Sequence, residues 1–273
     1  LSRQADAWIR EGQVEDVALP LYEGRMIGQF DFSQKGWVSG KGRTAVWRDI
    51  ERDNKVIEPQ FLMAKDTYQS AVGVLPGLKT VFMDVSSSTN WRTMISSIVA
   101  DAPCGNKAPT LSTSARSQLV LCVVLNSLVF DYQIRTRFSG LSLNYFIIEE
   151  CALLQQPSAA LFQYVLRWSE ALACAAGPFS PWRIEVESGR PPRPRALERA
   201  ERLRIRCQLD AIVAAAYGVD RLDLSTILMD CDLSGEELRQ RTRLRSLNPK
   251  GLWRVDKDKD PELRHTVLTL VAF

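Results

Sequence analysis

The clearest pattern of hydrophobic and polar positions lies in the middle of the chain. Residues 119–125 are apolar almost without interruption, polar residues follow, and the segment becomes cationic at Arg135 and Arg137. This pattern predicts a buried helix over about 114–137, then a Ser-Gly break and an extended segment over 143–148. A helix that ends this way either carries solvated arginines or presents them to a polyanion. The residues alone are compatible with both interpretations.

Before this helix the pattern is that of short strands separated by turn residues. These strands are predicted at 17–32, 44–50, 60–65, 79–85 and 91–99. The Gly- and Ser-rich segment 33–43 predicts a loop that carries Lys41 and Arg43 and is either solvated or placed against phosphates. Residues 2–11 predict a short helix at the start of the chain.

Beyond residue 155 the apolar positions recur at helical spacing. Helices are predicted at 156–174, 194–217, 220–230 and 234–246 and from 260 onward, with a proline-rich connector at 188–195. The fold class is therefore α+β, with a β-rich subdomain over 1–155 packed on the central helix and a mainly helical subdomain over 156–273. The arginine-rich first half of helix 194–217 indicates a solvated face, and a phosphate-contacting face is the alternative.

Composition constrains the function less than the pattern constrains the fold. The chain has 273 residues, 45% of them hydrophobic, and its net charge of +3 is too small to indicate nucleic-acid binding by itself. Arginines crowd into 183–206 and 239–245, so the distribution of charge is more informative than the total.

Cysteine and histidine usage indicates the compartment and argues against a metal site. The six cysteines are scattered without a C-x-x-C pair, and there is one histidine, His265, which we interpret as a packing or surface residue. We therefore expect reduced thiols and a cytoplasmic protein. No signal peptide is visible, and the apolar runs are shorter than the ~20 residues of a membrane span.

The segment LNSLVFDYQIRTRFSGLSLNYF at 125–146 resembles a region of bacterial DNA methyltransferases. It is similar to the C-terminal target-recognition part of the large N6-adenine enzymes of type IIG and BREX-like defence systems. Four further stretches resemble that family in the same order, namely LYEGRMIGQFDF at 21–32, FMDVSSSTNWRTMISSIVA at 82–100, RCQLDAIVAAAYGVDRLDLSTIL at 206–228 and GLWRVDKDKDPELRHTVLTLVAF at 251–273. The resemblance rests on the collinear order of these stretches, which are spread along the chain from residue 21 to residue 273.

The resemblance implies that this chain is the DNA-recognition fragment of a longer enzyme. A methyltransferase domain that uses S-adenosylmethionine is expected before residue 1, and double-stranded DNA and that domain are the expected partners. Loop arginines and lysines would hold the phosphate backbone, and side chains of the 86–93 turn and the 139–146 loop would enter the major groove. The implied DNA-contacting residues are Lys41, Arg43, Asn90, Arg92, Arg135, Arg137, Ser142 and Asn144.

The chain itself shows no pattern that is typical of a catalytic centre. Its one Pro-Pro pair, Pro191-Pro192, is flanked by arginines and does not fit the base-holding motif of an adenine methyltransferase, and no glycine-rich cofactor loop is present. With one histidine, a serine or cysteine triad is not readable either. We interpret the fragment as non-catalytic, without a cofactor or metal of its own.

Two other classes of function stay open. A protein-docking module of a defence complex would show a sizeable exposed apolar patch and salt-insensitive binding. A hydrolase with a degenerate motif would show a concave pocket with converging carboxylates.

Overall fold

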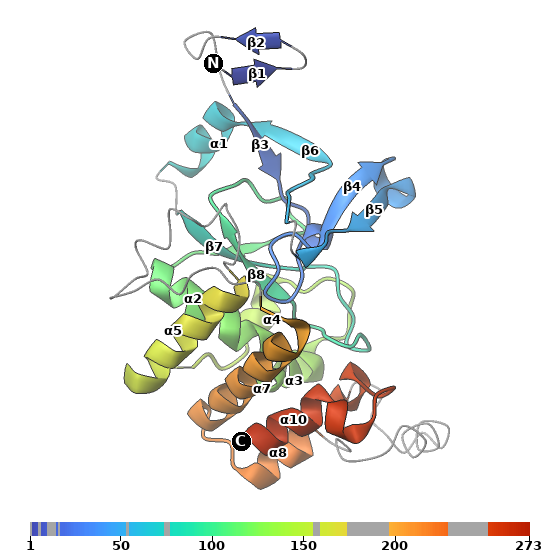
Figure 1. The fold of residues 1–273 in the computed structure, drawn as a ribbon, viewed down its shortest axis with the longest axis vertical. Coiled ribbons are helices and arrows are strands. Elements are labelled where there is room, and N and C mark those ends of the chain that lie inside the picture. Colours follow the sequence, from blue (N-terminus) through green and yellow to red (C-terminus); the bar gives the residue numbers. More distant parts are fainter. Residues whose placement is uncertain are drawn as a thin grey trace.

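The computed structural model describes residues 2–4, 7–9, 15, 17–52, 55–73, 77–154, 159–173, 197–228 and 251–273. It is a mixed α+β fold, which confirms the predicted fold class (Figure 1). Small antiparallel sheets form one end of the molecule, and helices from the second half of the chain gather at the other. Helix 234–246, the connector 188–195 and the arginines predicted to crowd 239–245 lie outside the described residues.

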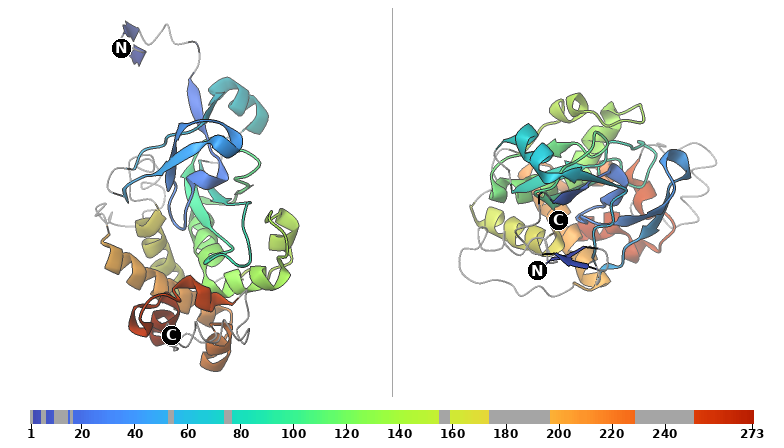
Figure 2. Two further views of the ribbon diagram at one scale, coloured as in Figure 1. Left: turned by 90° about the vertical axis from the view of Figure 1, so that its right-hand side faces the viewer. Right: turned by 90° about the horizontal axis from the view of Figure 1, so that it is seen from above.

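The strands pair in four small sheets, all antiparallel. The pairs are β1 (Ser2–Gln4) with β2 (Ala7–Ile9), β3 (Ala18–Leu21) with β6 (Phe61–Ala64), and β4 (Lys35–Ser39) with β5 (Val46–Asp49). The three-stranded sheet has the order β8 (Ser96–Ala100), β7 (Leu78–Phe82), β9 (Thr110–Leu111). In the side view of Figure 2, the β4–β5 hairpin crosses the face turned to the viewer.

The helices that frame this sheet come from both halves of the chain. They are α1 (Lys65–Val72), α2 (Ala115–Asn126), α3 (Leu128–Arg137), α4 (Tyr145–Glu149), α5 (Ala159–Ala173), α7 (Arg199–Ala216), α8 (Arg221–Ile227) and α10 (His265–Ala272). Short 3-10 helices lie at Gly24–Met26, Gly42–Thr44, Leu252–Val255 and Pro261–Leu263.

The predicted central helix is divided in two. α2 and α3 meet at Ser127 with a bend of 63°. Ser127 is extended at φ −73°, ψ 153°, and its hydroxyl accepts from the backbone N–H of Phe130 as an N-cap. Beside it, the Asn126 amide pairs with both backbone groups of Ser96 on β8, at 2.9 and 3.1 Å. The prediction of one continuous helix is wrong because Asn126 is bound to β8 at the break, and the N–H groups that the break frees at Leu128 and Phe130 are bound by Asp210 and by Ser127.

Both halves of the chain contribute to one core. Its largest cluster joins Met26 and Ile98 with Leu119 of α2, Leu166 of α5 and Leu209 of α7. A second cluster lies between the sheet and α3–α4, and a third joins α3 to α7 and α8. Among the described residues no single helix is long and apolar enough to cross a membrane. The bent α2–α3 pair passes that test only when its two helices are taken together.

Three predicted elements are wrong. Within the predicted helix 2–11, the described residues 2–4 and 7–9 form the β1–β2 pair, since so short a helix gains little without tertiary packing. The predicted loop 33–43 contains strand β4, and two of its glycines, Gly40 and Gly42, belong to the hairpin turn with φ of +76° and +55°. The predicted extended segment 143–148 contains helix α4, because Leu143, Ile147 and Cys151 are buried at a spacing of four.

Two boundaries also differ from the prediction. The strand predicted over 17–32 ends at Leu21, and a 3-10 turn follows it. The last helix begins at His265, because the Asp-Pro-Glu start that the sequence favours forms only the 3-10 turn Pro261–Leu263.

Candidate nucleic-acid interface

Two loops that lie far apart in the sequence are joined in the structure. Residues 84–93 connect β7 to β8, residues 139–144 connect α3 to α4, and we call them together the paired loops. The Ser86 N–H donates to the Leu141 carbonyl at 3.1 Å, and the Leu143 N–H donates to the Asp84 carbonyl at 2.7 Å. An antiparallel bridge joins Val85 to Ser142 between them. The two segments that the sequence assigned to one DNA surface therefore lie side by side.

The Asp84 carboxylate fixes this junction. It is almost fully buried, and its Oδ2 accepts from the Ser142 hydroxyl at 2.9 Å and from the Lys107 ammonium at 2.7 Å. The Ser142 hydroxyl, predicted to contact a base, is thus already bound to Asp84. Lys107, which the sequence analysis missed, keeps half of its side chain exposed beside the junction and adds a cation there.

Arg135 does not point toward solvent. Its side chain is 2% exposed, and its Nε donates to Asp131 Oδ2 at 2.6 Å one helical turn earlier. Its Nη2 donates to the carbonyls of Asn90 and Trp91, both at 3.0 Å. Burial lowers the pKa of Arg135, and Asp131 opposes that shift. The expectation that Arg135 contacts DNA is wrong, since this arginine fastens the 84–93 loop to α3.

Asp131 completes the support of the same loop. Its Oδ1 accepts from the backbone N–H groups of Thr93 and Met94, at 2.9 and 2.7 Å. The carboxylate is fully buried and uses both oxygens. Asn90 and Trp91 therefore lie at the surface on a loop that Asp131 and Arg135 of α3 hold through its backbone.

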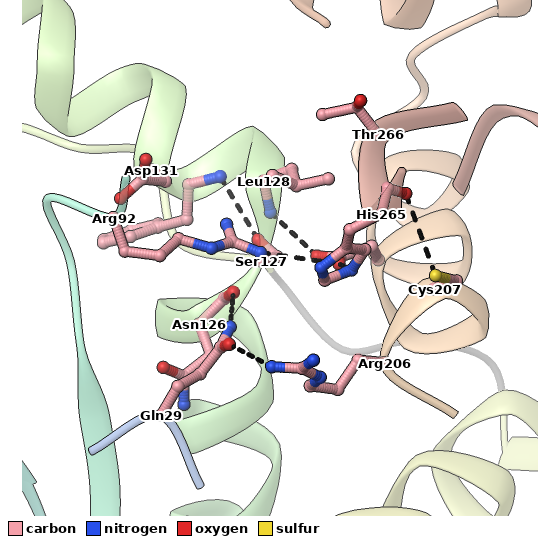
Figure 3. A network of polar contacts seen from close by, with 12 residues as sticks. Gln29, Arg92, Asn126, Ser127, Leu128, Asp131, Arg206, Cys207, His265 and Thr266 are labelled. Carbon is pink, nitrogen blue, oxygen red and sulfur yellow. Dashed lines mark hydrogen bonds and ion pairs between the residues drawn. The ribbon is translucent and has the colours of Figure 1, made fainter. Parts of the chain in front are cut away.

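Arg92 is also inside the molecule, which contradicts its prediction as a DNA-facing arginine. Its side chain is 0% exposed, and its Nη2 lies 3.8 Å from Asp210 Oδ2 on α7 (Figure 3). Within the described part of the chain, its three guanidinium nitrogens have no hydrogen-bond partner. Asp210 also accepts from the Leu128 N–H at 2.8 Å and lies 2.6 Å from His265 Nε2.

His265 is a buried packing residue, one of the two roles expected from the sequence. Burial lowers its pKa, with the positive charges of Arg92 and Arg206 acting in the same direction and Asp210 opposing them. The neutral ring then donates its Nε2 proton to Asp210. In the part of the chain that is described, no group of three or more His, Cys, Asp or Glu residues could hold a metal ion. Four cysteines, Cys104, Cys122, Cys151 and Cys207, are free thiols.

The other predicted contact residues fall on two surfaces. Asn90 and Asn144 are exposed on the paired loops, and Arg137 is exposed at the end of α3. Lys41 and Arg43 are exposed at the turn of the β4–β5 hairpin, which projects separately (Figure 1). Ser142 and Asn144 lie beside residues 84–86, at the start of the loop that carries Asn90.

Exposed apolar side chains surround the same loops. Val85, Trp91, Leu141 and Phe146 are 55%, 48%, 74% and 58% exposed. Val85 forms an antiparallel bridge with Ser142, and the Leu141 carbonyl accepts from the Ser86 N–H. Val85 and Leu141 therefore lie on neighbouring backbone segments. This surface therefore combines amides, cations and apolar groups.

A third feature is a cleft of about 610 Å³ at the start of α7, lined by Gln29, Arg52, Leu197, Glu198, Arg199, Arg202 and Arg206. We call it the arginine cleft. The sequence favoured a solvated face here, with a phosphate-contacting face as the alternative, whereas Arg202 is 7% exposed and Arg206 is half-buried. The positions 199, 202 and 206, three and four apart on one helix face, are the signal that could have identified it.

The comparisons with known proteins identify no relative. No protein-family model, no curated protein and no solved structure matches the chain.

Proposed function

We propose that this chain binds duplex DNA and selects the sequence that an attached N6-adenine methyltransferase domain modifies, using S-adenosylmethionine, in the cytoplasm of a bacterium. The parent enzyme would be a type IIG or BREX-like defence methyltransferase, and the fragment its non-catalytic recognition part. One observation carries the proposal. The two segments that the family resemblance assigns to one DNA surface, 86–93 and 139–146, are hydrogen-bonded to each other, since the Ser86 N–H donates to the Leu141 carbonyl at 3.1 Å.

The paired loops have the chemistry that base recognition needs. The Asn90 and Asn144 amides are exposed, and an amide can make a bidentate contact to adenine in the major groove. Lys107 and Arg137 are exposed cations near the loops and suit phosphate contacts. The supporting bonds from Arg135 and Asp131 fix the 84–93 loop before DNA arrives, which reduces the entropy lost on binding.

The first experiment measures binding of the chain to random-sequence duplex DNA over a salt series. Affinity that falls steeply with salt supports phosphate contacts, and selection of bound sequences then gives the recognised site. In that selected site, Asn90→Ala or Asn144→Ala should weaken binding by about 1–3 kcal/mol and relax specificity at one base pair. Thr67→Ala, at an exposed position of α1, is the control. Specific binding that survives both asparagine changes would refute the assignment.

A second candidate is a protein-docking module, favoured by the exposed Val85, Trp91, Leu141 and Phe146. In that case the paired loops would contact another protein of the defence complex. Binding would be insensitive to salt and would be lost in Leu141→Gln, a neutral polar change that should leave a phosphate-dominated DNA contact nearly intact.

A further inference from the structure

The arginine cleft carries more positive charge than its own residues neutralise. Four arginines and one glutamate line it. Glu198 has no side-chain hydrogen bond to the start of α7, where it occupies the N-cap position. The amino end of this 18-residue helix adds partial positive charge to the same region.

Among the described residues, the buried arginine of the cleft is held by carbonyl groups and not by a carboxylate. Arg202 Nη1 donates to the Leu172 carbonyl at 3.0 Å, and its Nη2 lies 3.5 Å from the Phe30 carbonyl. Burial lowers the pKa of Arg202, and the neighbouring charges of Arg52 and Arg206 lower it further. Since arginine stays protonated in proteins, these effects mean that the folded chain holds unfavourable like charges together.

Two carboxylates outside the cleft lining, Asp31 and Asp210, act on its arginines but are bound to other groups. Asp31 pairs with Lys55 at 2.8 Å and also accepts from the Ser33 N–H. Asp210, whose charge acts on Arg206, is bound to His265 and to the Leu128 N–H. Within the described residues, neither is placed to neutralise the cleft.

Arg206 is fixed by one hydrogen bond, and other N–H groups of its guanidinium stay unused among the described residues. Its Nη1 donates to Gln29 Oε1 at 2.9 Å, and Gln29 in turn donates to the Asn126 carbonyl at 3.1 Å (Figure 3). The Nε of Arg206 is buried and has no hydrogen-bond partner in the described part of the chain. Gln29 precedes Phe30, whose φ of +54° is uncommon for a residue other than glycine. A strained turn and a fixed amide thus orient this guanidinium, and such strain often marks functional positions.

We propose that the arginine cleft is a phosphate-binding site, in which Arg52, Arg199 and Arg206 donate to the phosphate oxygens and the buried Arg202 supplies charge from beneath. Guanidinium groups bind phosphate through paired, charge-assisted hydrogen bonds. The cleft volume of about 610 Å³ is within the range of small-molecule sites and exceeds what a single phosphate fills. The ligand is therefore a phosphate ester, either a free nucleotide-sized molecule or a backbone phosphate of nucleic acid. This site is separate from the paired loops and does not depend on their reading DNA.

The test uses the whole chain and sodium pyrophosphate as the probe, with inorganic phosphate in parallel, at an ionic strength held constant with chloride. Binding is followed by calorimetry and by the shift in melting temperature. Wild type should bind pyrophosphate, and Arg52→Gln and Arg199→Gln should each weaken it about tenfold or more, since each removes a charge-assisted donor. Both arginines are exposed, so the variants should fold. Arg221→Gln, at an exposed position of α8, should bind like wild type.

A short duplex DNA, titrated against the same variants, separates the two sources of phosphate. DNA binding that weakens in Arg52→Gln and Arg199→Gln, with pyrophosphate as a competitor, identifies a backbone phosphate. Arginine-dependent pyrophosphate binding together with unchanged or absent DNA binding identifies a small phosphate ester, and it leaves the cleft proposal intact even where the DNA proposal fails. The cleft proposal is overturned if wild type does not bind pyrophosphate, or if both variants bind it as well as wild type does.

Discussion

The molecule has two buried polar networks, one centred on the Asp131 carboxylate and one on the Asp210 carboxylate. They differ in how closely an arginine pairs with the carboxylate. Around Asp131, the guanidinium of Arg135 has a carboxylate at 2.6 Å and several carbonyl acceptors. Around Asp210, Arg92 comes no nearer than 3.8 Å, because His265 and a backbone N–H bind the carboxylate first. The arginine cleft continues this second region through Arg206. A fully partnered arginine fixes a loop, whereas under-neutralised arginines leave positive potential for a ligand.

The largest effect is expected from removing the centre of the complete network. Asp131→Ala would leave Arg135 buried without its carboxylate and two backbone N–H groups of the 84–93 loop without an acceptor. The free energy of unfolding should fall by about 3–5 kcal/mol in urea titrations. As a control, Asp49→Ala, whose side chain is 83% exposed, should change it by less than about 0.5 kcal/mol. Equal effects at the two positions would contradict the role given to Asp131.

The Asp210 network should make the stability of the chain depend on pH through His265. The pKa of His265 is lowered in the folded state, where Asp210, Arg92 and Arg206 face its ring. The unfolded chain therefore takes up a proton below its ordinary pKa of about 6.5, while the folded chain does not. Stability is fully present above about pH 6.5 and is lost as the pH falls, by up to about 1.4 kcal/mol per pH unit.

Urea unfolding at pH 7.0, 6.5, 6.0 and 5.5 measures this slope. His265 is the single histidine of the chain, so His265→Gln should flatten the curve in that window whatever it does to the stability at pH 7. A slope that persists in the variant would assign the titration to another group.

In the arginine cleft we expect a smaller change in the free energy of unfolding, and its sign should differ between chloride and pyrophosphate buffers. Arg52 raises the electrostatic cost of the buried Arg202 charge, so Arg52→Gln should stabilise the chain slightly in chloride, by a few tenths of a kcal/mol. With saturating pyrophosphate the same variant should be less stable than wild type, because it loses the stabilisation that binding provides. Arg135→Gln should destabilise the chain in both buffers. If Arg52→Gln changed the stability in the same direction in both buffers, the distinction between the cleft arginines and the carboxylate-paired Arg135 would be lost.

The sequence predicted those features that depend on local patterns. The apolar run before Asn126 gave a helix, and the alternation around residues 46–49 and 78–82 gave strands. The break at Ser127 was missed because it depends on Asn126 pairing with Ser96, thirty positions earlier. Arg135 could have been assigned to Asp131 from their spacing of four, but nothing local to Arg92 identifies Asp210 as its neighbour. Exposed and buried arginines look alike in a sequence, so the sequence could not show that Arg92 and Arg135 point into the molecule.

The last prediction concerns cations that, unlike Arg92 and Arg135, lie on the surface. Lys41 and Arg43 flank the hairpin turn at Gly42, whereas Arg48 on β5 is paired with Glu58. Replacing Lys41 and Arg43 by glutamine should hardly change stability, since both side chains are solvated. If the hairpin reaches DNA phosphates, the double variant should reduce the slope of log K against log salt by about two, with sequence preference retained. An unchanged slope in an otherwise DNA-binding chain would remove the hairpin from the interface and confine the DNA contacts to the paired loops and the arginine cleft.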